Sequence, residues 1–115
     1  MALVTLLFSV SLITNTTAQA RPKHLTVKYA INLNWCGKPK KSCAAGREAL
    51  RVAWCESHWY TWAKNGQYLG IFQMGSNERK LFGHGNNAWD QAKAAYKYYV
   101  VSGRDWSPWS CRWAA

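Results

Sequence analysis

Acidic residues are scarce in this 115-residue sequence: 5 Asp and Glu stand against 15 Lys and Arg, which gives a formal net charge of +10. No C-x2-C pair is present, and the histidines His24, His58 and His84 are scattered, so the usual spacing of a zinc site is missing. Repeats, low-complexity tracts and interdomain linkers are absent as well. These absences argue against several domains and make zinc the weaker interpretation of the cysteines. We predict one basic domain without a metal or cofactor.

A long hydrophobic run is also lacking. The apolar residues 3–13 are too few to span a bilayer, and they are followed by polar residues 14–17 and by Ala18-Gln19-Ala20, an A-x-A cleavage pattern. We interpret residues 1–20 as a secretory signal peptide cut after Ala20, although no basic residue precedes the apolar stretch. An N-terminal core helix is the alternative. The protein is therefore expected to be secreted or associated with the cell wall, with no stable membrane span.

The 4 cysteines are interpreted as disulfides, because an even number in an exported chain is typical of covalent staples. Four cysteines allow three pairings. Cys36 and Cys43 end the loop CGKPKKSC, whose Gly and Pro let the chain turn back, and this leaves Cys55 for Cys111. About 95 residues would remain after export, a modest size at which staples help. By loop entropy the long bridge contributes about 4 kcal/mol and the short one about 2.5 kcal/mol.

The charge of +10 lies entirely after residue 20 and is spread along the chain. Such a field favours an anionic partner. For an exported protein the best candidate is an anionic cell-wall polymer. Nucleic acid is disfavoured because the basic residues form no concentrated patch or helix. A solvated basic surface without a dedicated partner is the alternative.

The first part of the predicted mature chain mixes short apolar runs with Pro, Gly and lysines. Residues 21–43 are therefore interpreted as a basic N-terminal arm, mostly irregular, that either extends the core or adds affinity for the wall. Ser42 is expected to cap a helix that runs from about residue 43 to residue 57. In that segment Ala49, Val52 and Ala53 recur at helical spacing and no proline interrupts.

Asn65-Gly66 is a hairpin-turn signal, so residues 67–74 are expected to form a short strand pair or an irregular tongue. Ser76 would cap a short helix that Gly83 ends, and Asn87 would cap a longer one that Gly103 ends. Most of the 8 tryptophans are expected to be mainly buried. The last helix carries a helical stripe formed by Trp89, Ala92, Tyr96, Tyr99 and Val100, and of these Trp89, Tyr96 and Tyr99 are expected in the core. The predicted class is α+β, mainly α, with a short β-hairpin and disulfide staples.

Glu56 would stand at the C-terminal end of the first confident helix, next to aromatic residues. A helix C-terminus disfavours an anion, so a glutamate here calls for an explanation other than stability. Desolvation beside aromatic rings favours the protonated form of a carboxyl, which can then serve as a general acid. An exposed glutamate without a special role is the alternative.

The segments Glu56-Ser57 and Gly70-Ile71-Phe72-Gln73-Met74 resemble the E-S and G-L-M-Q motifs of soluble lytic transglycosylases in the lysozyme-like superfamily. Cys55-Glu56-Ser57, Asn65-Gly66 and the sequence W-S-P-W-S-C at residues 106–111 resemble the compact resuscitation-promoting-factor branch. Leu69 and Ile71 depart from that branch, and the M-P-x-T continuation of the larger family is absent after Met74. The resemblance implies a lysozyme-like catalytic domain over residues 44–115.

The resemblance implies a peptidoglycan-cleaving glycosidase that acts on the β-1,4 linkage between MurNAc and GlcNAc, and that has glycan strands as its partner. Glu56 would be the general acid and then the base on the muramyl 6-hydroxyl, as in a lytic transglycosylase. Gln73 and the backbone at Gly70 would line the sugar cleft, and Ser57 would support the glutamate. We also expect Tyr68 and Trp62 to contact glycan, because flat aromatic rings fit the apolar C–H faces of sugars. The protein is expected to be a monomer.

Three alternatives remain. A hydrolytic muramidase needs a second carboxylate. Glu48 lies about 12 Å before Glu56 along a helix, too far to cooperate. Glu78, Asp90 and Asp105 remain as candidates for this second carboxylate. Glu78 is the best placed of them, although no spacing selects it.

A thiol enzyme is the second alternative, and it would use Cys55 or Cys36 with a histidine. A non-catalytic, cationic cell-wall-binding domain is the third alternative.

Overall fold

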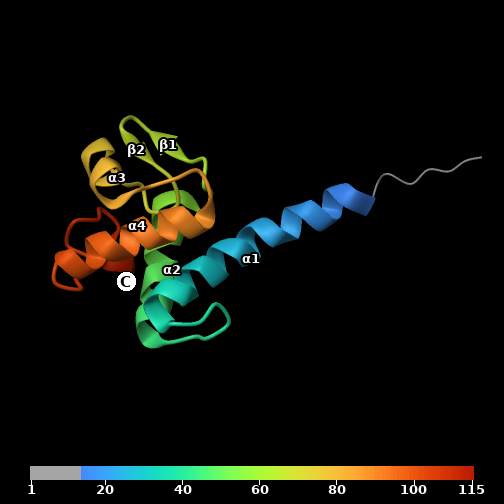
Figure 1. Ribbon diagram of the computed structural model, residues 1–115, viewed down its shortest axis with the longest axis horizontal. Helices are drawn as coiled ribbons and strands as arrows, with labels where there is room; N and C mark the ends of the chain where they lie inside the picture. The colour runs from blue at the N-terminus through green and yellow to red at the C-terminus, as the bar shows by residue number, and fades with distance from the viewer. Residues whose placement is uncertain (1–13) are drawn as a thin grey trace, which may run out of the picture.

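The computed structural model describes the backbone of residues 14–115 and the side chains from residue 24 onward. Its elements are α1 (Thr14–Cys36), α2 (Ala44–Ser57), β1 (Lys64–Asn65), β2 (Tyr68–Leu69), α3 (Ser76–Phe82), α4 (Ala88–Val101) and the final 3-10 helix η1 (Arg112–Ala114) (Figure 1). β1 and β2 pair antiparallel, with Lys64 opposite Leu69. The predicted class, mainly α with a short hairpin and two disulfides, is confirmed.

The helix α1 occupies the segment that the sequence predicted to be an irregular arm, so that prediction was wrong. Val27, Ala30, Ile31 and Trp35 follow one another at helical spacing and are all buried. This face packs against α2 and α4 (Figure 1). Lys28 stays exposed. The end of α1 therefore extends the core, which includes residues on both sides of position 43.

The predicted signal peptide is described only in part. Residues 1–13 lie outside the described residues, and the predicted cleavage point after Ala20 falls within α1. The N-terminal end of this helix projects away from the other elements (Figure 1). Among residues 14–115, no helix combines the length and the hydropathy that a bilayer crossing needs. Export and cleavage stay predictions.

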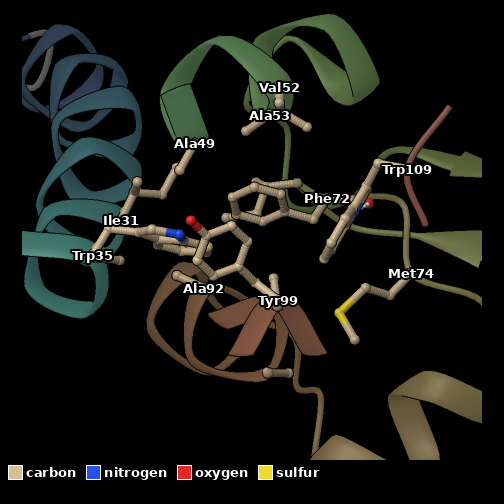
Figure 2. Close-up of a cluster of buried hydrophobic side chains, with 14 of the residues drawn as sticks. Ile31, Trp35, Ala49, Val52, Ala53, Phe72, Met74, Ala92, Tyr99 and Trp109 are labelled. Carbon is tan, nitrogen blue, oxygen red and sulfur yellow. Dashed lines mark hydrogen bonds between the residues drawn. The ribbon is translucent and has the colours of Figure 1, made fainter. Parts of the chain in front are cut away.

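Aromatic rings from three separate parts of the chain meet in the core (Figure 2). Trp35 of α1 stacks on Phe72, with ring centroids 5.4 Å apart, and on Trp106 of the tail, at 5.7 Å. Ala49 of α2 and Ala92 of α4 are fully buried, and their small side chains let both helices close around the rings. Burial of a side chain such as Phe72 stabilises the fold by about 1.5–3 kcal/mol.

The helix termini agree with the sequence at some positions and differ at others. Asn87 caps α4 by accepting a hydrogen bond from the backbone N–H of Asp90, and Gly83 ends α3 in a left-handed conformation, as predicted. The cap of α2 is Cys43 rather than Ser42: its Sγ accepts from the N–H of Gly46. Its sulfur therefore serves both the cap and a disulfide.

Most tryptophans are mainly buried, as predicted, although several rings keep a large exposed surface. Trp35, Trp106 and Trp109 are buried, but the exposed fractions are 47% for Trp54, 67% for Trp62, 41% for Trp89 and 77% for Trp113. In the predicted stripe on α4, Ala92 and Tyr99 are buried, whereas Trp89 is exposed in the first turn of the helix. A chain with 8 tryptophans and a core of this size leaves several rings on the surface.

Both predicted disulfides are confirmed. Cys36 pairs with Cys43, with Cα atoms 5.6 Å apart, and Cys55 pairs with Cys111, at 6.0 Å. The short bridge closes the loop between α1 and α2. The long bridge joins the last turn of α2 to the C-terminal tail, and it fixes two segments that lie 56 residues apart in the sequence.

Candidate functional site

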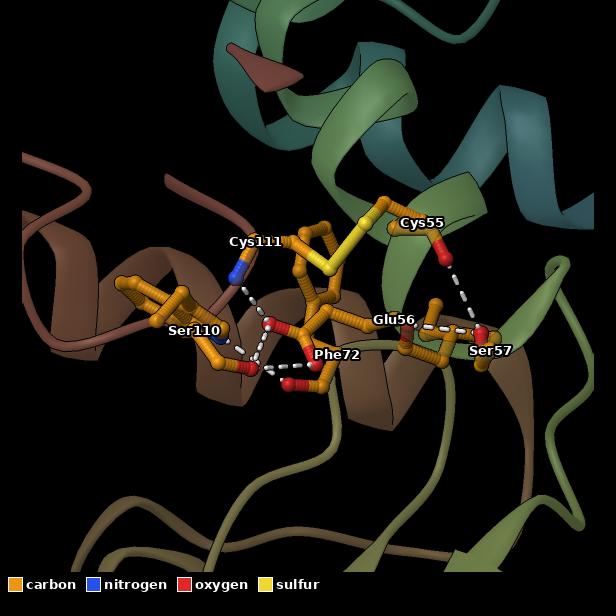
Figure 3. Close-up of a disulfide and its surroundings, with 9 residues drawn as sticks. Cys55, Glu56, Ser57, Phe72, Ser110 and Cys111 are labelled. Carbon is orange, nitrogen blue, oxygen red and sulfur yellow. Dashed lines mark hydrogen bonds between the residues drawn. A yellow bond between two sulfur atoms is a disulfide. The ribbon is translucent and has the colours of Figure 1, made fainter. Parts of the chain in front are cut away.

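Glu56 lies in the last turn of α2, and the C-terminal tail holds its carboxylate in place (Figure 3). The hydroxyl of Ser110 lies 3.3 Å from Oε1 and 3.2 Å from Oε2, and the backbone N–H of Cys111 donates to Oε2 at 3.0 Å. The side chain is only partly buried. The carboxylate is therefore oriented by fixed donors while it stays within reach of solvent.

Ser57 ties the end of α2 to the segment after the hairpin. Its hydroxyl lies 2.8 Å from the carbonyl oxygen of Ile71 and 3.1 Å from that of Ala53, and it accepts from the N–H of Trp59. Ser57 is buried. It can support Glu56 by fixing the backbone on both sides of the cleft, and no hydrogen bond joins it to the Glu56 carboxylate.

A cleft of about 400 Å³ opens beside Glu56. It is lined by Glu56, Asn65, Tyr68, Gln73, Met74, Gly75, Glu78, Tyr98, Pro108, Trp109 and Ser110. A smaller hollow of about 280 Å³ continues past the helix end and shares Glu56, Asn65 and Gln73 with the cleft. The fold thus brings Glu56 together with Gln73 and Tyr68, in the middle of an elongated groove.

Gln73 is held rigidly at the edge of this groove. Its backbone has a φ of 47°, in the left-handed region, and its Nε2 donates to the carbonyl oxygens of Ala63 and Gly70, each at 3.0 Å. Its Oε1 accepts no hydrogen bond from the described residues. The amide is therefore positioned to accept a hydrogen bond from a bound molecule.

Gly70 does not line the groove. A Cβ added at this position would lie 2.6 Å from Oε1 of Gln91 and 2.9 Å from Nε2 of His84, so the close approach is to these side chains and not to a sugar. Its φ of 88° also suits glycine. The sequence analysis expected a close approach at this glycine, but the neighbours are protein side chains.

Gln91 is a buried polar side chain that the sequence analysis missed. Its Oε1 accepts from the N–H of Ile71, and its Nε2 donates to the carbonyl oxygens of Thr61 and Gly85. One side chain on α4 thereby satisfies three backbone groups from separate loops. No local sequence pattern predicts that a glutamine side chain will form hydrogen bonds with three separate loops.

Trp62 lies outside the Glu56 cleft, in a separate hollow described below. Tyr68 lines the cleft and is 46% exposed. Of the two aromatic residues that the sequence analysis expected to contact glycan, only Tyr68 is therefore close to the acid.

Glu78, in the first turn of α3, lines the same cleft as Glu56. The other carboxylates are engaged elsewhere: Glu48 accepts from Nε1 of Trp106, Asp90 from the cap Asn87, and Asp105 from the N–H of Ser107. Burial raises the pKa of Tyr98 on the cleft wall, and the negative charge of Glu78 raises it further. Of the other four acidic residues, Glu78 is thus the one that lines the same cleft as Glu56.

No cysteine is free, because all four are bridged, and this removes the nucleophile that a thiol enzyme needs. Among the residues that the structure describes, no three side chains of His, Cys, Asp or Glu gather in a way that could hold a metal ion.

No protein-family model, curated protein or solved structure was found to match this chain. The resemblance to lytic transglycosylases therefore depends on the short motifs quoted above. The geometry of the cleft is an independent observation, and it brings Glu56 and Gln73 of those motifs to one groove.

Proposed function

We propose that this protein cleaves the glycan strands of peptidoglycan at the linkage between MurNAc and GlcNAc, and that it does so as a lytic transglycosylase. The observation that carries the proposal is the Glu56 carboxylate, held by Ser110 and Cys111 on a groove that also contains Tyr68 and Gln73. Positioning of this kind is what a general acid requires.

In the proposed reaction, protonated Glu56 gives its proton to the glycosidic oxygen, and the bond between this oxygen and C1 of MurNAc breaks. The resulting carboxylate takes the proton of the muramyl 6-hydroxyl while that oxygen attacks C1. The products are a strand with a free GlcNAc 4-hydroxyl and a strand with a 1,6-anhydromuramyl end. Glu56 recovers its proton and no water is consumed, so one carboxylate serves both steps.

The groove supplies contacts of two kinds for a saccharide. The exposed ring of Tyr68 offers a flat apolar surface, and Oε1 of Gln73 can accept a hydrogen bond from a sugar hydroxyl. The net charge of +10 adds a long-range attraction to anionic wall polymers. These features support a wall glycan over an uncharged, isolated sugar as the substrate.

Hydrolysis by a muramidase is the second candidate, and the position of Glu78 favours it. Glu78 lies in the same cleft as Glu56, as a water-activating carboxylate would. The two reactions differ in their products, because hydrolysis leaves a reducing muramic end. Glu78 is dispensable in the first reaction and required in the second.

The decisive measurement is mass spectrometry of the fragments that the oxidised protein releases from purified peptidoglycan. We expect anhydromuramyl ends from the parent and from Glu78→Gln, and none from Glu56→Gln. Asp105→Asn is the matched control, since Asp105 lies outside the cleft. Reducing ends that require both Glu56 and Glu78 would replace the transglycosylase by a muramidase. A parent that sediments with insoluble peptidoglycan but releases nothing would be a non-catalytic wall-binding domain.

A further inference from the structure

A second concave site, here called the aromatic pocket, lies apart from the Glu56 cleft. It encloses about 570 Å³, which is within the usual range of ligand sites, and its lining shares no residue with the cleft. Three parts of the chain form it: α1, the turn that follows α2, and the start of α4. Its lining includes His24, Trp59, Tyr60, Thr61, Trp62 and Asn86.

Stacked rings form one wall of the aromatic pocket. The rings of Tyr60 and Trp62 stack with centroids 4.6 Å apart and planes inclined by 19°. His24 of α1 contacts Tyr60 at 5.8 Å and Trp59 at 5.9 Å. Trp62 is 67% exposed although a second ring supports it. A supported and exposed ring is a pre-organised surface, because it loses little conformational freedom when a ligand binds.

The backbone that carries this wall is strained. His58 and Trp59 have φ values of 53° and 65°, in the left-handed region that non-glycine residues rarely occupy. Trp59 is fixed there because its N–H donates to the Ser57 hydroxyl and its Nε1 donates to the carbonyl oxygen of Leu50. Conformations of this kind persist only where the surroundings hold them, and they gather at binding and active sites.

The side chains that line the pocket limit the chemical class of ligand that it can bind. It contains no Asp or Glu to bind an organic cation and no Lys or Arg to bind a phosphate or carboxylate. Besides His24, its polar side chains are amides and hydroxyls, and they include Thr61 and Asn86. The exposed side chain of Asn86 forms no hydrogen bond with the described residues. The ligand that fits is uncharged, with an apolar face for the rings and hydroxyls or amides for the polar side.

We propose that the aromatic pocket is a saccharide-binding site, in which the C–H face of a neutral pyranose stacks on Trp62 and its hydroxyls meet Asn86 and Thr61. The pocket would hold a glycan at a distance from the acid and would not take part in bond cleavage. The inference depends on the lining of the pocket and stands without any reaction at Glu56.

The test uses 15N-labelled Glu56→Gln protein and the tetrasaccharide of N-acetylglucosamine as the probe. Titration should shift the backbone amide signals of Thr61 and Asn86. Adding Trp62→Ala should raise the dissociation constant obtained from these shifts about tenfold, the effect of one lost stacking contact. Trp113→Ala should leave it unchanged, because Trp113 is the most exposed tryptophan and lies outside the pocket.

The signals of Gln73 and Ser110 report on the Glu56 cleft in the same titration, so loss of one site is distinguished from loss of the other. The proposal fails if Thr61 and Asn86 do not respond to the tetrasaccharide, or if they respond equally with and without Trp62. A larger response to single-stranded oligothymidylate than to the tetrasaccharide would also overturn it, because the stacked partner would then be a nucleobase.

Discussion

The backbone N–H of Cys111 donates a 3.0 Å hydrogen bond to Oε2 of Glu56, across 55 residues of sequence. Cys111 is bridged to Cys55, the residue that precedes Glu56, so donor and acceptor are anchored to each other covalently. The C-terminal tail is therefore part of the candidate site as well as of the core.

Replacing Ser110 by Ala should lower the rate of glycan cleavage about tenfold, since a hydrogen bond to a charged group contributes about 1.5 kcal/mol. The cleft shape and the Cys111 contact should remain. Turnover of soluble glycan strands measures the effect. Ser107→Ala, in the same tail, is the control, because the hydroxyl of Ser107 does not contact Glu56. Equal rates for both variants would show that Ser110 does not orient the acid.

Removal of each disulfide should have a different effect on the free energy of unfolding and on glycan cleavage. Cys55→Ala with Cys111→Ala should lower the free energy of unfolding by about 4 kcal/mol, and Cys36→Ala with Cys43→Ala by about 2.5 kcal/mol. Only the first pair should abolish cleavage under conditions where the protein is still folded, because only that pair anchors the donors of Glu56. Urea unfolding and fragment release measure the two quantities. Full activity without the long bridge would contradict the assigned role of the tail.

Trp35→Ala should lower the free energy of unfolding by about 3–5 kcal/mol, the usual cost of deleting a large core ring. Trp35 is buried and stacks on Phe72 and Trp106. Trp113→Ala, at a surface position, should change it by about 0.5 kcal/mol or less. Chemical denaturation compares the variants. Similar stabilities would mean that the end of α1 is not part of the cooperative core.

Burial lowers the pKa of the His84 imidazole below its usual 6.5, the positive charge of Arg79 lowers it further, and Asp90 acts in the opposite direction. The unfolded chain therefore binds this proton more readily than the folded one. The contribution of His84 to stability should be fully present above about pH 6.5 and should be lost as the pH falls below it.

Urea unfolding at several pH values between 8 and 5 tests this dependence. His84→Gln should flatten the acid side of the stability curve. A curve that keeps its shape in His84→Gln would assign the loss of stability to other groups.

Short sequence motifs correctly predicted the features that depend only on residues close together in the chain. Asn65-Gly66 gave the hairpin, Asn87 gave the cap of α4, and the Gly- and Pro-containing loop gave the first disulfide. Each of these depends on residues close together in the sequence. The end of α2 at Ser57 was also predicted correctly.

The features that the sequence did not predict depend on contacts between residues far apart in the chain. The helical spacing of Val27, Ala30, Ile31 and Trp35 was readable, but the lysines and Gly37 favoured an irregular interpretation. The contact of Ser110 with Glu56 spans 54 residues, and nothing local marks that serine. For the same reason, Glu78 could be named as the best-placed candidate for a second carboxylate, but it could not be placed in the cleft until the fold was known.

Under the proposed function, the bridge between Cys55 and Cys111 would make the positioning of the Glu56 carboxylate depend on redox state. While these thiols are reduced, nothing covalent keeps the tail donors beside Glu56, so a newly made chain in a reducing compartment would be latent. Oxidation would complete the site.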